Sequence, residues 1–429
     1  MSLRNNLARK PPMGWNSYDC FASLVTEKEV KANADFMARE LAGFGWRYVV
    51  VDIEWYCSKP PPDPKTPGIY VMDECGRPLP DPSRFPSSVG GNGFKPLADY
   101  IHGLGLRFGI HLMRGIPRDA VERNLPVLGA SLRARDIANK DSACAWSVEK
   151  WGVDMSKPGA QAYYDSVVAL AAQWEVDYIK WDDMSSPYHA DEIAAACDAI
   201  RKCGRPILLS LSPGDRSDPA NANHLKDHCE LWRISKDVWD DWAQVKNQFA
   251  PCRDWAPHSG PGHWPDADML PLGHLSLRDT YGDRRDHMCR LTRDEQTTLM
   301  TLWTIFRSPL MIGSNLPTMN DPFTLSLLTN PDVINVNQNS INNRELLQKG
   351  DTIIWTADAV GSQVKYLAFF NLSDTGPARI EIELKDLRFA GRCCVRDLWR
   401  RTGAGHVKGK FAATIPLHGA GLFRIHKQR

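Results

Sequence analysis

The positions of apolar residues follow a repeated order along the first half of the chain. Four stretches share it: apolar residues at helical spacing, a short turn, and a nearly continuous apolar run that ends in polar residues. Strands of this apolar character are typical of a parallel sheet that helices cover on both faces. The pattern predicts an α/β protein, with the repeated unit at residues 37–56, 97–115, 167–184 and 200–215.

Weaker strand patterns on either side raise the number of predicted strands to eight. Eight strands with intervening helices predict a (β/α)8 TIM barrel, enlarged here by insertions. A doubly wound open sheet is the alternative, but no GxGxxG sequence follows the first strand. The predicted strands are residues 13–17, 48–54, 107–112, 178–183, 206–212, 230–235, 266–270 and 309–313.

The pattern changes near residue 340. Beyond it, short runs alternate apolar and polar residues between Gly, Asp and Asn, and no run has helix length. We expect residues 1–340 to form the barrel and residues 341–429 to form a C-terminal antiparallel β-sandwich domain. Residues 58–92, rich in Pro, Gly and Asp, predict a long loop or insertion after the second strand.

Polar side chains stand where the predicted barrel strands end. The loops that follow barrel strands gather at one face, so these side chains should meet there. Most of them are acids, with a few cations among them, which predicts a site of chemistry at the barrel mouth. The set is Asp52, Glu54, His111, Lys180, Asp182, Asp183, Ser210, Ser212, Arg233, Asp237, Asp266 and Asp268.

Lys180 and Asp182 lie two residues apart on one predicted strand, in the sequence DYIKWDDM. Their side chains therefore point to the same side, into the barrel. A lysine keeps a nearby carboxylate ionised, and an ionised carboxylate can attack the anomeric carbon of a sugar. A structural ion pair is the alternative. Acids on several other strand ends favour the functional interpretation.

Several carboxylates at a barrel mouth suit two kinds of chemistry. Three acids can hold a divalent metal, and a pair of acids can hydrolyse a glycoside. The cations Lys180 and Arg233 disfavour a metal cage. Aromatic residues, on which sugar rings stack, follow the same strands and favour the glycoside: Trp15, Tyr18, Trp55, Tyr56, Trp181, Trp239 and Trp264.

Composition limits the class of partner and the compartment. The chain is 43% hydrophobic and 24% charged with a net charge of +1, so it can form a core, and nothing suggests nucleic acid. No run is long and apolar enough to predict a membrane span, and the polar start MSLRNNLARK is no secretory signal. We expect a cytoplasmic protein or one trimmed of its signal. A homo-oligomer is left open, and 11 scattered cysteines give no disulfide framework.

The segments PPMGWNSYDCF, YIKWDD, LWRISKD, WPDADML, LTRDEQTTLMTLWTIFRSPLMIGSNL and VINVNQN share a resemblance. In this order they resemble motifs of glycoside hydrolase family 27, the α-galactosidases (melibiases) and α-N-acetylgalactosaminidases. The matches run from Pro11 to Asn339 and cover the predicted barrel. The resemblance implies a (β/α)8 barrel followed by an antiparallel β-sandwich, a carbohydrate substrate, and neither cofactor nor metal.

The resemblance also implies roles for matching residues. Asp182 matches the nucleophile and Asp237 the acid/base residue of a retaining mechanism, in which the two carboxyl groups lie about 5–5.5 Å apart. Asp183 is expected to be a loop or supporting residue. Residues at or next to substrate-binding positions of the family are Tyr18, Asp52, Glu54, His111, Lys180, Ser212, Arg233 and Asp268.

Departures from the family pattern bear on the substrate. Ile53 stands where the family has a second aspartate that helps to read the axial hydroxyl of the sugar. Glu54 is either its substitute or an exposed loop residue. Ser212 replaces a glutamate of the galactosidases and resembles the N-acetylgalactosaminidases, although Asp215 breaks that pattern. Met184 replaces a cysteine, which removes a disulfide near the site.

The sequence therefore predicts a retaining exo-acting α-glycosidase that releases terminal α-linked galactose from oligosaccharides or glycoconjugates. An α-N-acetylgalactosaminidase, with Ser212 as specificity residue, is the first alternative. A family 27 hydrolase of α-glucans or β-L-arabinopyranosides is the next. A non-catalytic carbohydrate-binding barrel is the alternative of another class, and the presence of both Asp182 and Asp237 argues against it.

Overall fold

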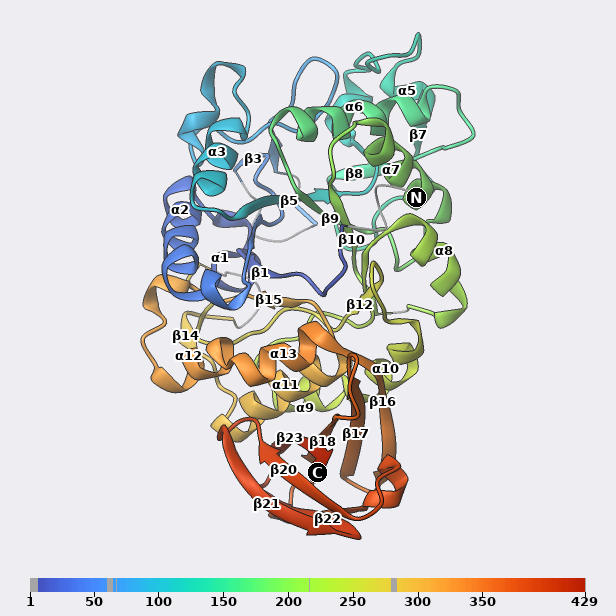
Figure 1. Cartoon of the computed structure of the whole chain (residues 1–429). Coiled ribbons are helices and arrows are strands. Elements are labelled where there is room, and N and C mark those ends of the chain that lie inside the picture. The colour runs from blue at the N-terminus through green and yellow to red at the C-terminus, as the bar shows by residue number, and fades with distance from the viewer. Residues whose placement is uncertain (1–6, 60–64, 67, 216, 279–283, 429) are drawn as a thin grey trace.

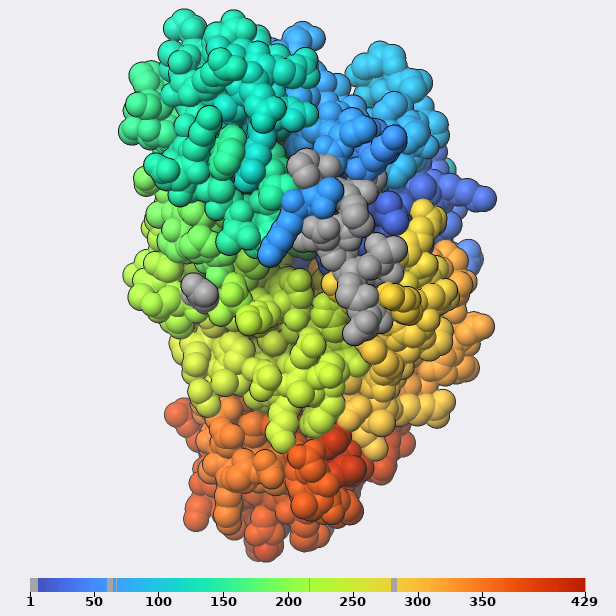
Figure 2. Space-filling view, turned by 180° about the vertical axis from the view of Figure 1, so that it is seen from behind, coloured from blue at the N-terminus to red at the C-terminus, as the bar shows by residue number. Residues whose placement is uncertain are grey.

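The structure is a computed structural model that describes residues 7–59, 65–66, 68–215, 217–278 and 284–428. Its larger part is a barrel of parallel strands surrounded by helices, and its smaller part is a C-terminal β domain (Figure 1). The space-filling view shows the two parts in direct contact, with the C-terminal domain in orange and red below the barrel (Figure 2).

The barrel strands pair in the order β12-β11-β10-β9-β5-β2-β1-β15, and every neighbouring pair is parallel. A parallel bridge from Leu270, which follows β12, to Ile312 of the other edge strand closes the sheet on itself. The predicted α/β barrel is therefore confirmed. The strands are β1 (Met13–Asn16), β2 (Tyr48–Val51), β5 (Arg107–Met113), β9 (Tyr178–Asp182), β10 (Leu208–Leu211), β11 (Leu231–Arg233), β12 (Trp264–Asp266) and β15 (Leu310–Ile312).

The seventh barrel strand differs from the prediction. It spans Trp264–Asp266 instead of residues 266–270. The chain turns away from the sheet because the Asp266 carboxylate accepts from the backbone N–H of Asp268, and Asp268 has a φ of 89°, which a strand does not allow. This turn carries Asp268 to the wall of the cavity described below.

Helices follow the barrel strands and cover the outside of the sheet. The first long one, α2, begins at a capping box of Thr26 and Glu29, and its apolar residues Val30 and Ala34 are completely buried. The helices are α1 (Tyr18–Phe21), α2 (Glu27–Phe36), α3 (Lys95–Gly103), α4 (Arg118–Glu122), α5 (Ala134–Ile137), α6 (Ala160–Gln173), α7 (Ala190–Lys202), α8 (Ala222–His228), α9 (Trp242–Lys246), α10 (Phe249–Trp255), α11 (Arg293–Phe306), α12 (Pro322–Thr329) and α13 (Pro331–Asn339).

Insertions enlarge the loops at the barrel mouth. The predicted loop at residues 58–92 contains a short hairpin and a 3-10 turn at Pro86–Gly91, while residues 60–64 and 67 lie outside the described part. Two more insertions follow β5 and β12. The short strands of the three insertions are β3 (Cys57–Lys59), β4 (Ile69–Tyr70), β6 (Ile116–Pro117), β7 (Ala138–Asn139), β8 (Lys150–Val153), β13 (His274–Leu275) and β14 (His287–Met288).

The C-terminal domain consists of antiparallel strands, as the alternating pattern predicts. A six-stranded sheet has the order β16-β17-β18-β23-β20-β21, and a separate pair is β19-β22. Since β16 begins at Ser340, a division of the chain at residue 340 stays a prediction that fits the strand bounds. The strands are β16 (Ser340–Lys349), β17 (Thr352–Ala359), β18 (Lys365–Asn371), β19 (Ala378–Glu383), β20 (Arg392–Asp397), β21 (Thr402–Lys408), β22 (Lys410–Ile415) and β23 (Ala420–Lys427).

The six-stranded sheet has two buried faces. Trp355 and Phe370 belong to the same hydrophobic cluster as the barrel, whereas their chain neighbours Ile354 and Phe369 belong to a cluster inside the C-terminal domain. Successive side chains of a strand point to opposite faces, so one face packs on the barrel and the other on the β19-β22 pair. This shared core braces the barrel against the C-terminal domain.

Candidate active site

A cavity of about 520 Å³ opens at the ends of the barrel strands. Eight of the ten predicted site residues line it: Tyr18, Asp52, Glu54, Lys180, Asp182, Arg233, Asp237 and Asp268. The strand ends that the sequence suggested therefore meet in one place. The other wall residues are Asp19, Ser23, Ile53, Trp146, Pro213, Asp215, Lys236, Met269 and Arg284.

Asp182 lies on the more enclosed side of this cavity. Its side chain, at the end of β9, is 14% exposed, and its Oδ2 lies 3.2 Å from His111 Nε2. The backbone N–H of Asp183 donates to Asp182 Oδ1 at 2.7 Å. Lys180, two residues earlier, forms an ion pair with Asp52 Oδ2 at 2.9 Å. The contacts with His111 and with the backbone N–H of Asp183 hold the Asp182 carboxylate in one orientation.

The charges around Asp182 determine its protonation. Burial alone would raise the pKa of Asp182, but the hydrogen bond and charge of His111 and the charge of Lys180 lower it below its usual value. Burial likewise opposes the charge on Asp52, yet Lys180 and His111 lower the pKa of Asp52 strongly. Both acids are therefore ionised at neutral pH.

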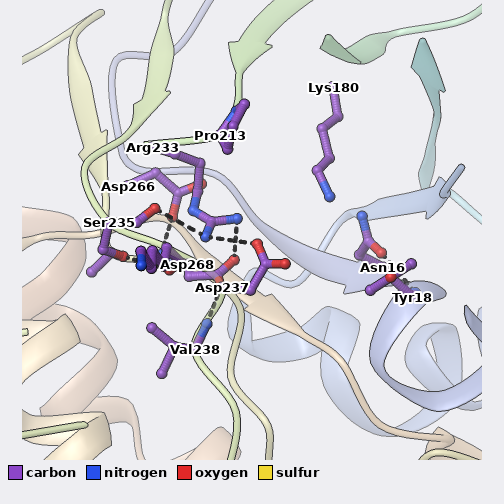
Figure 3. Close-up of polar contacts among 12 residues, drawn as sticks. Asn16, Tyr18, Lys180, Pro213, Arg233, Ser235, Asp237, Val238, Asp266 and Asp268 are labelled. Atoms are coloured by element: carbon purple, nitrogen blue, oxygen red, sulfur yellow. Dashed lines mark hydrogen bonds and ion pairs between the residues drawn. The ribbon is translucent and has the colours of Figure 1, made fainter. Parts of the chain in front are cut away.

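Arg233 organises the opposite side of the cavity. Its Nη1 lies 2.6 Å from Asp268 Oδ1 and its Nη2 lies 3.2 Å from Asp237 Oδ1. Figure 3 shows the guanidinium directed between these two acids, while Lys180 points toward Asn16 and Tyr18. The Asp237 side chain is 63% exposed, in contrast to Asp182.

Asp268 is buried beneath Asp237. Its Oδ2 accepts from the backbone N–H of Val238 at 2.6 Å, which fixes the loop that carries Asp237. Burial raises the pKa of Asp268 to about 7, with Arg233 opposing the shift and the charge of Asp237 adding to it. Two acids thus share one cation here, so this side of the cavity holds a proton more readily than the Asp182 side.

Two predicted residues do not line the large cavity. His111 is completely buried in the barrel and acts on the cavity through its contact with Asp182. Ser212 is 2% exposed and lines a small cavity together with Ser210 and Asp266. This small cavity adjoins the large one, since Lys180, Arg233, Asp268 and Met269 line both. The next residue, Pro213, forms the wall of the large cavity instead.

Asp183 and Glu54 are buried. Asp183 pairs with Arg114 at 2.8 Å, so it is a supporting residue as predicted. Glu54 is 3% exposed, which excludes the exposed loop glutamate that the sequence allowed. Burial and the neighbouring carboxylate of Glu149 raise the pKa of Glu54 to about 8. The Tyr56 hydroxyl donates to Glu149 at 2.9 Å and stabilises its charge.

Ile53 gives the charged cavity one apolar wall. It is 8% exposed and packs with Met113 and Cys144 in a small hydrophobic cluster that Tyr18 and Trp146 border. The Ile53 backbone N–H donates to Asp52 Oδ1 at 2.9 Å, and this hydrogen bond holds the Asp52 side chain in place. At this wall the cavity presents an apolar surface to a carbon of the substrate, instead of hydrogen-bonding groups.

Asp19 is a functional candidate that the sequence analysis did not name. It lies in α1, the short helix after β1, is 3% exposed and lines the cavity. A Cβ at position 313 would lie 2.0 Å from Asp19 Oδ2, so this carboxyl fits only against Gly313. Burial and the charges of Asp268 and Asp237 raise the pKa of Asp19 well above its usual value. The rule of acids at strand ends could have found it.

Among the described residues, one group of acids and histidine has metal-binding spacing: Asp99, His102 and Glu175. It lies at the end of α3, outside the cavity, and Lys95 contacts both Asp99 and Glu175. The ammonium group of Lys95 therefore already occupies the position between the two carboxylates. In the part of the chain that the structure covers, no helix has the length and apolar character of a membrane span.

Comparison with known proteins gives a consistent result. The sequence model of alpha galactosidase A matches residues 148–339, and that of the alpha galactosidase C-terminal beta sandwich domain matches residues 349–425. The solved structure of a GH27 β-L-arabinopyranosidase from Geobacillus stearothermophilus, in complex with arabinose, is 46% identical. It covers 100% of both chains with a TM-score of 0.96.

The chain belongs to glycoside hydrolase family 27. The family hydrolyses glycosides, so this glycoside hydrolase acts on a carbohydrate. Alpha-galactosidase 2 of Arabidopsis thaliana is 25% identical over 100% of the chain and 92% of that relative. The α-N-acetylgalactosaminidase of Mus musculus is 29% identical over 91% of the chain and 83% of that relative. The resemblance drawn from the motifs is confirmed.

Proposed function

We propose that this glycoside hydrolase is a retaining, exo-acting β-L-arabinopyranosidase. The observation that carries the proposal is the apolar wall formed by Ile53 with Met113 and Cys144. β-L-Arabinopyranose has the ring configuration of α-galactopyranose and lacks the hydroxymethyl group on C5. A cavity that accepts one sugar ring therefore chooses between the two sugars at the position of that group.

The wall at Ile53 suits the smaller sugar. By resemblance, an aspartate at this position reads the axial hydroxyl on C4, and the C5 substituent is its neighbour on the ring. A hydroxymethyl group against Ile53 would leave its hydroxyl without a partner, which costs about 1–3 kcal/mol. The bare C5 methylene of arabinopyranose loses no hydrogen bond there. The 46% identical β-L-arabinopyranosidase supports the same assignment.

Asp182 acts as the nucleophile in this proposal. Its ionised carboxylate attacks the anomeric carbon as Asp237 gives its proton to the leaving oxygen, which breaks the glycosidic bond and forms a glycosyl ester on Asp182. Asp237 then takes a proton from water, and the resulting hydroxide displaces Asp182 with overall retention. The separation of about 5–5.5 Å between the two carboxyl groups stays a prediction.

Other residues bind or orient the sugar. Lys180 and Asp52 form a fixed donor and acceptor pair for ring hydroxyls, and Arg233 holds Asp237 beside the leaving oxygen. Asp268 and Tyr18 complete the wall. His111 orients Asp182 from below. The oligomeric state stays open.

Release of terminal α-linked galactose is the second candidate, because both matching family models are those of alpha galactosidase and Asp52 is retained. An α-N-acetylgalactosaminidase is less well supported. Ser212, the residue that would make room for an acetamido group, lines the small cavity that adjoins the main one and does not line the main one itself.

The test compares nitrophenyl β-L-arabinopyranoside, α-galactopyranoside and α-N-acetylgalactosaminide with wild-type protein, using the Asp182→Asn variant as the blank. We expect kcat/KM for the arabinopyranoside to exceed that for the galactoside by roughly 10-fold or more. A preference for either larger sugar would contradict the assignment of Ile53 as the residue that excludes the hydroxymethyl group.

A further inference from the structure

A second cavity of about 570 Å³ adjoins the sugar cavity. The two share three wall residues: Asp215, Lys236 and Asp237. The second cavity lies between the loop after β10 and the helices α9 and α10, in the yellow-green part of the chain that lies above the C-terminal domain (Figure 2). Asp237, with 63% of its side chain exposed, stands at the junction.

The position of the junction has a chemical meaning. In the proposed mechanism, Asp237 protonates the oxygen that joins the released sugar to its leaving group. The released sugar occupies the cavity that contains Asp182, so the leaving group must extend beyond Asp237. The second cavity begins there. We propose that it is a binding site for the leaving group, and that the natural leaving group is a second pyranose unit of an oligosaccharide. This inference rests on the proposed function.

The lining of the second cavity suits a sugar ring. Polar side chains of Gln244, Asn247 and Gln248 line it together with the apolar ring of Pro251. A pyranose has the same mixture of hydroxyl groups and carbon faces. The cavity is also large enough for one ring, since ligand sites begin near about 300 Å³.

Two of these polar groups bear on the proposal in different ways. Gln248 is 5% exposed, and its Oε1 has no hydrogen-bond partner among the described residues, so a donor from a ligand would satisfy it. Gln244 is already fixed, because its Oε1 accepts from the backbone N–H of Trp239 at 2.9 Å. Trp239 in turn stacks against the guanidinium of Arg284 from the sugar cavity, at 4.0 Å from its ring centre. This chain of contacts ties the wall of one cavity to the wall of the other.

The experiment separates the leaving-group site from the sugar site. Ala250, an exposed residue of α10, lines the second cavity, and Ala250→Trp fills it. Ala243 is an exposed residue of α9 outside both linings, so Ala243→Trp is the matched control. The substrates are β-L-arabinopyranosyl fluoride, whose leaving group is a single atom, and β-L-arabinopyranosyl-(1→3)-L-arabinose.

We expect Ala250→Trp to lower kcat/KM for the disaccharide by roughly 10-fold while the glycosyl fluoride loses less than about 2-fold, because fluoride does not reach the second cavity. The Ala243→Trp control should match the wild type on both substrates. Equal losses on the two substrates with Ala250→Trp, or no loss on either, would overturn the leaving-group site.

A binding measurement keeps this test independent of the proposed function. Calorimetry with Asp182→Asn protein should show that the disaccharide binds roughly 10-fold more tightly than L-arabinose, and Ala250→Trp in that background should abolish the difference. Equal affinities in both backgrounds would overturn the site. Absence of turnover of every nitrophenyl glycoside by wild type would instead overturn the proposed function, and the calorimetric difference would still decide this inference.

Discussion

The two sides of the sugar cavity differ in how far they enclose an aspartate and in which charged groups surround it. Asp182 is 14% exposed and lies near two groups that favour its charge, His111 and Lys180. Asp237 is 63% exposed and shares a single cation, Arg233, with Asp268. One acid is enclosed among cations and the other stands open among acids.

This difference teaches how one residue type can serve two roles in one cavity. A carboxylate near positive charge, such as Asp182, stays ionised and can attack carbon. The openness of Asp237 gives water and the leaving group access to it. The enclosure of Asp182 limits which substrate atoms can reach its carboxylate, and in the proposed mechanism the anomeric carbon is the one that does.

Removal of the charge at Asp182 should have the largest effect. Asp182→Asn is expected to lower kcat by at least about 10⁴-fold on every glycoside, because the covalent step is lost whatever the leaving group. Steady-state rates on nitrophenyl and disaccharide substrates measure it. Unfolding temperatures of the two proteins control for the fold, and a loss confined to poor leaving groups would contradict the nucleophile role.

Asp237→Asn should show the opposite dependence on the leaving group. Loss of acid assistance is expected to lower kcat/KM by about 10²–10⁴-fold for a sugar leaving group and far less for dinitrophenol, which departs without a proton. A series of aryl glycosides with leaving groups of graded pKa measures this. In the variant, the logarithm of kcat/KM should fall more steeply as the pKa of the leaving group rises. A parallel slope in variant and wild type would contradict the acid role.

The apolar wall should set the choice of sugar. Ile53→Asp places a carboxylate where a hydroxymethyl group needs a partner, and the ratio of galactoside to arabinopyranoside kcat/KM is expected to rise by roughly 10- to 100-fold. Ile53→Val, which keeps the wall apolar, should leave the ratio near its wild-type value. If the valine variant shifts the ratio as much as the aspartate variant, polarity is not the cause.

Glu54 should give the smallest effect, on stability against pH. Its folded-state pKa is raised to about 8, so the protonated form is favoured by folding. That stabilisation is complete below the unfolded pKa near 4.5 and is lost as pH rises through about 8. Between pH 5 and pH 8 the Tm of the wild type should fall by roughly 2–4 °C more than that of Glu54→Gln. Identical pH profiles would contradict the raised pKa of Glu54.

Much of this arrangement could be predicted because it depends on local rules. Apolar runs gave the eight strands, and polar residues at their ends gave the acids and cations of the cavity. Residues that reach the cavity from loops could not be found this way. Trp146 comes from the insertion after β5, and Arg284 from the insertion after β12. No periodicity marks where such a loop folds back.

Side-chain direction at a strand end was the other limit. Ser212 and Pro213 are adjacent, and the sequence could not show that the proline faces the sugar cavity while the serine faces the small one. The raised pKa of Glu54 was equally hidden, because it combines burial with the charge of Glu149, which lies almost a hundred residues further along the chain. Contacts between distant segments decide these points.

Covalent trapping tests the division of roles most directly. In 2-deoxy-2-fluoro-β-L-arabinopyranosyl fluoride, the ring fluorine slows both steps and fluoride leaves without an acid, so the glycosyl ester should accumulate. We predict inactivation by one equivalent, with the sugar on the peptide that contains Asp182 and none on the peptide that contains Asp237. A label on Asp237, or turnover with no labelled peptide, would contradict the account.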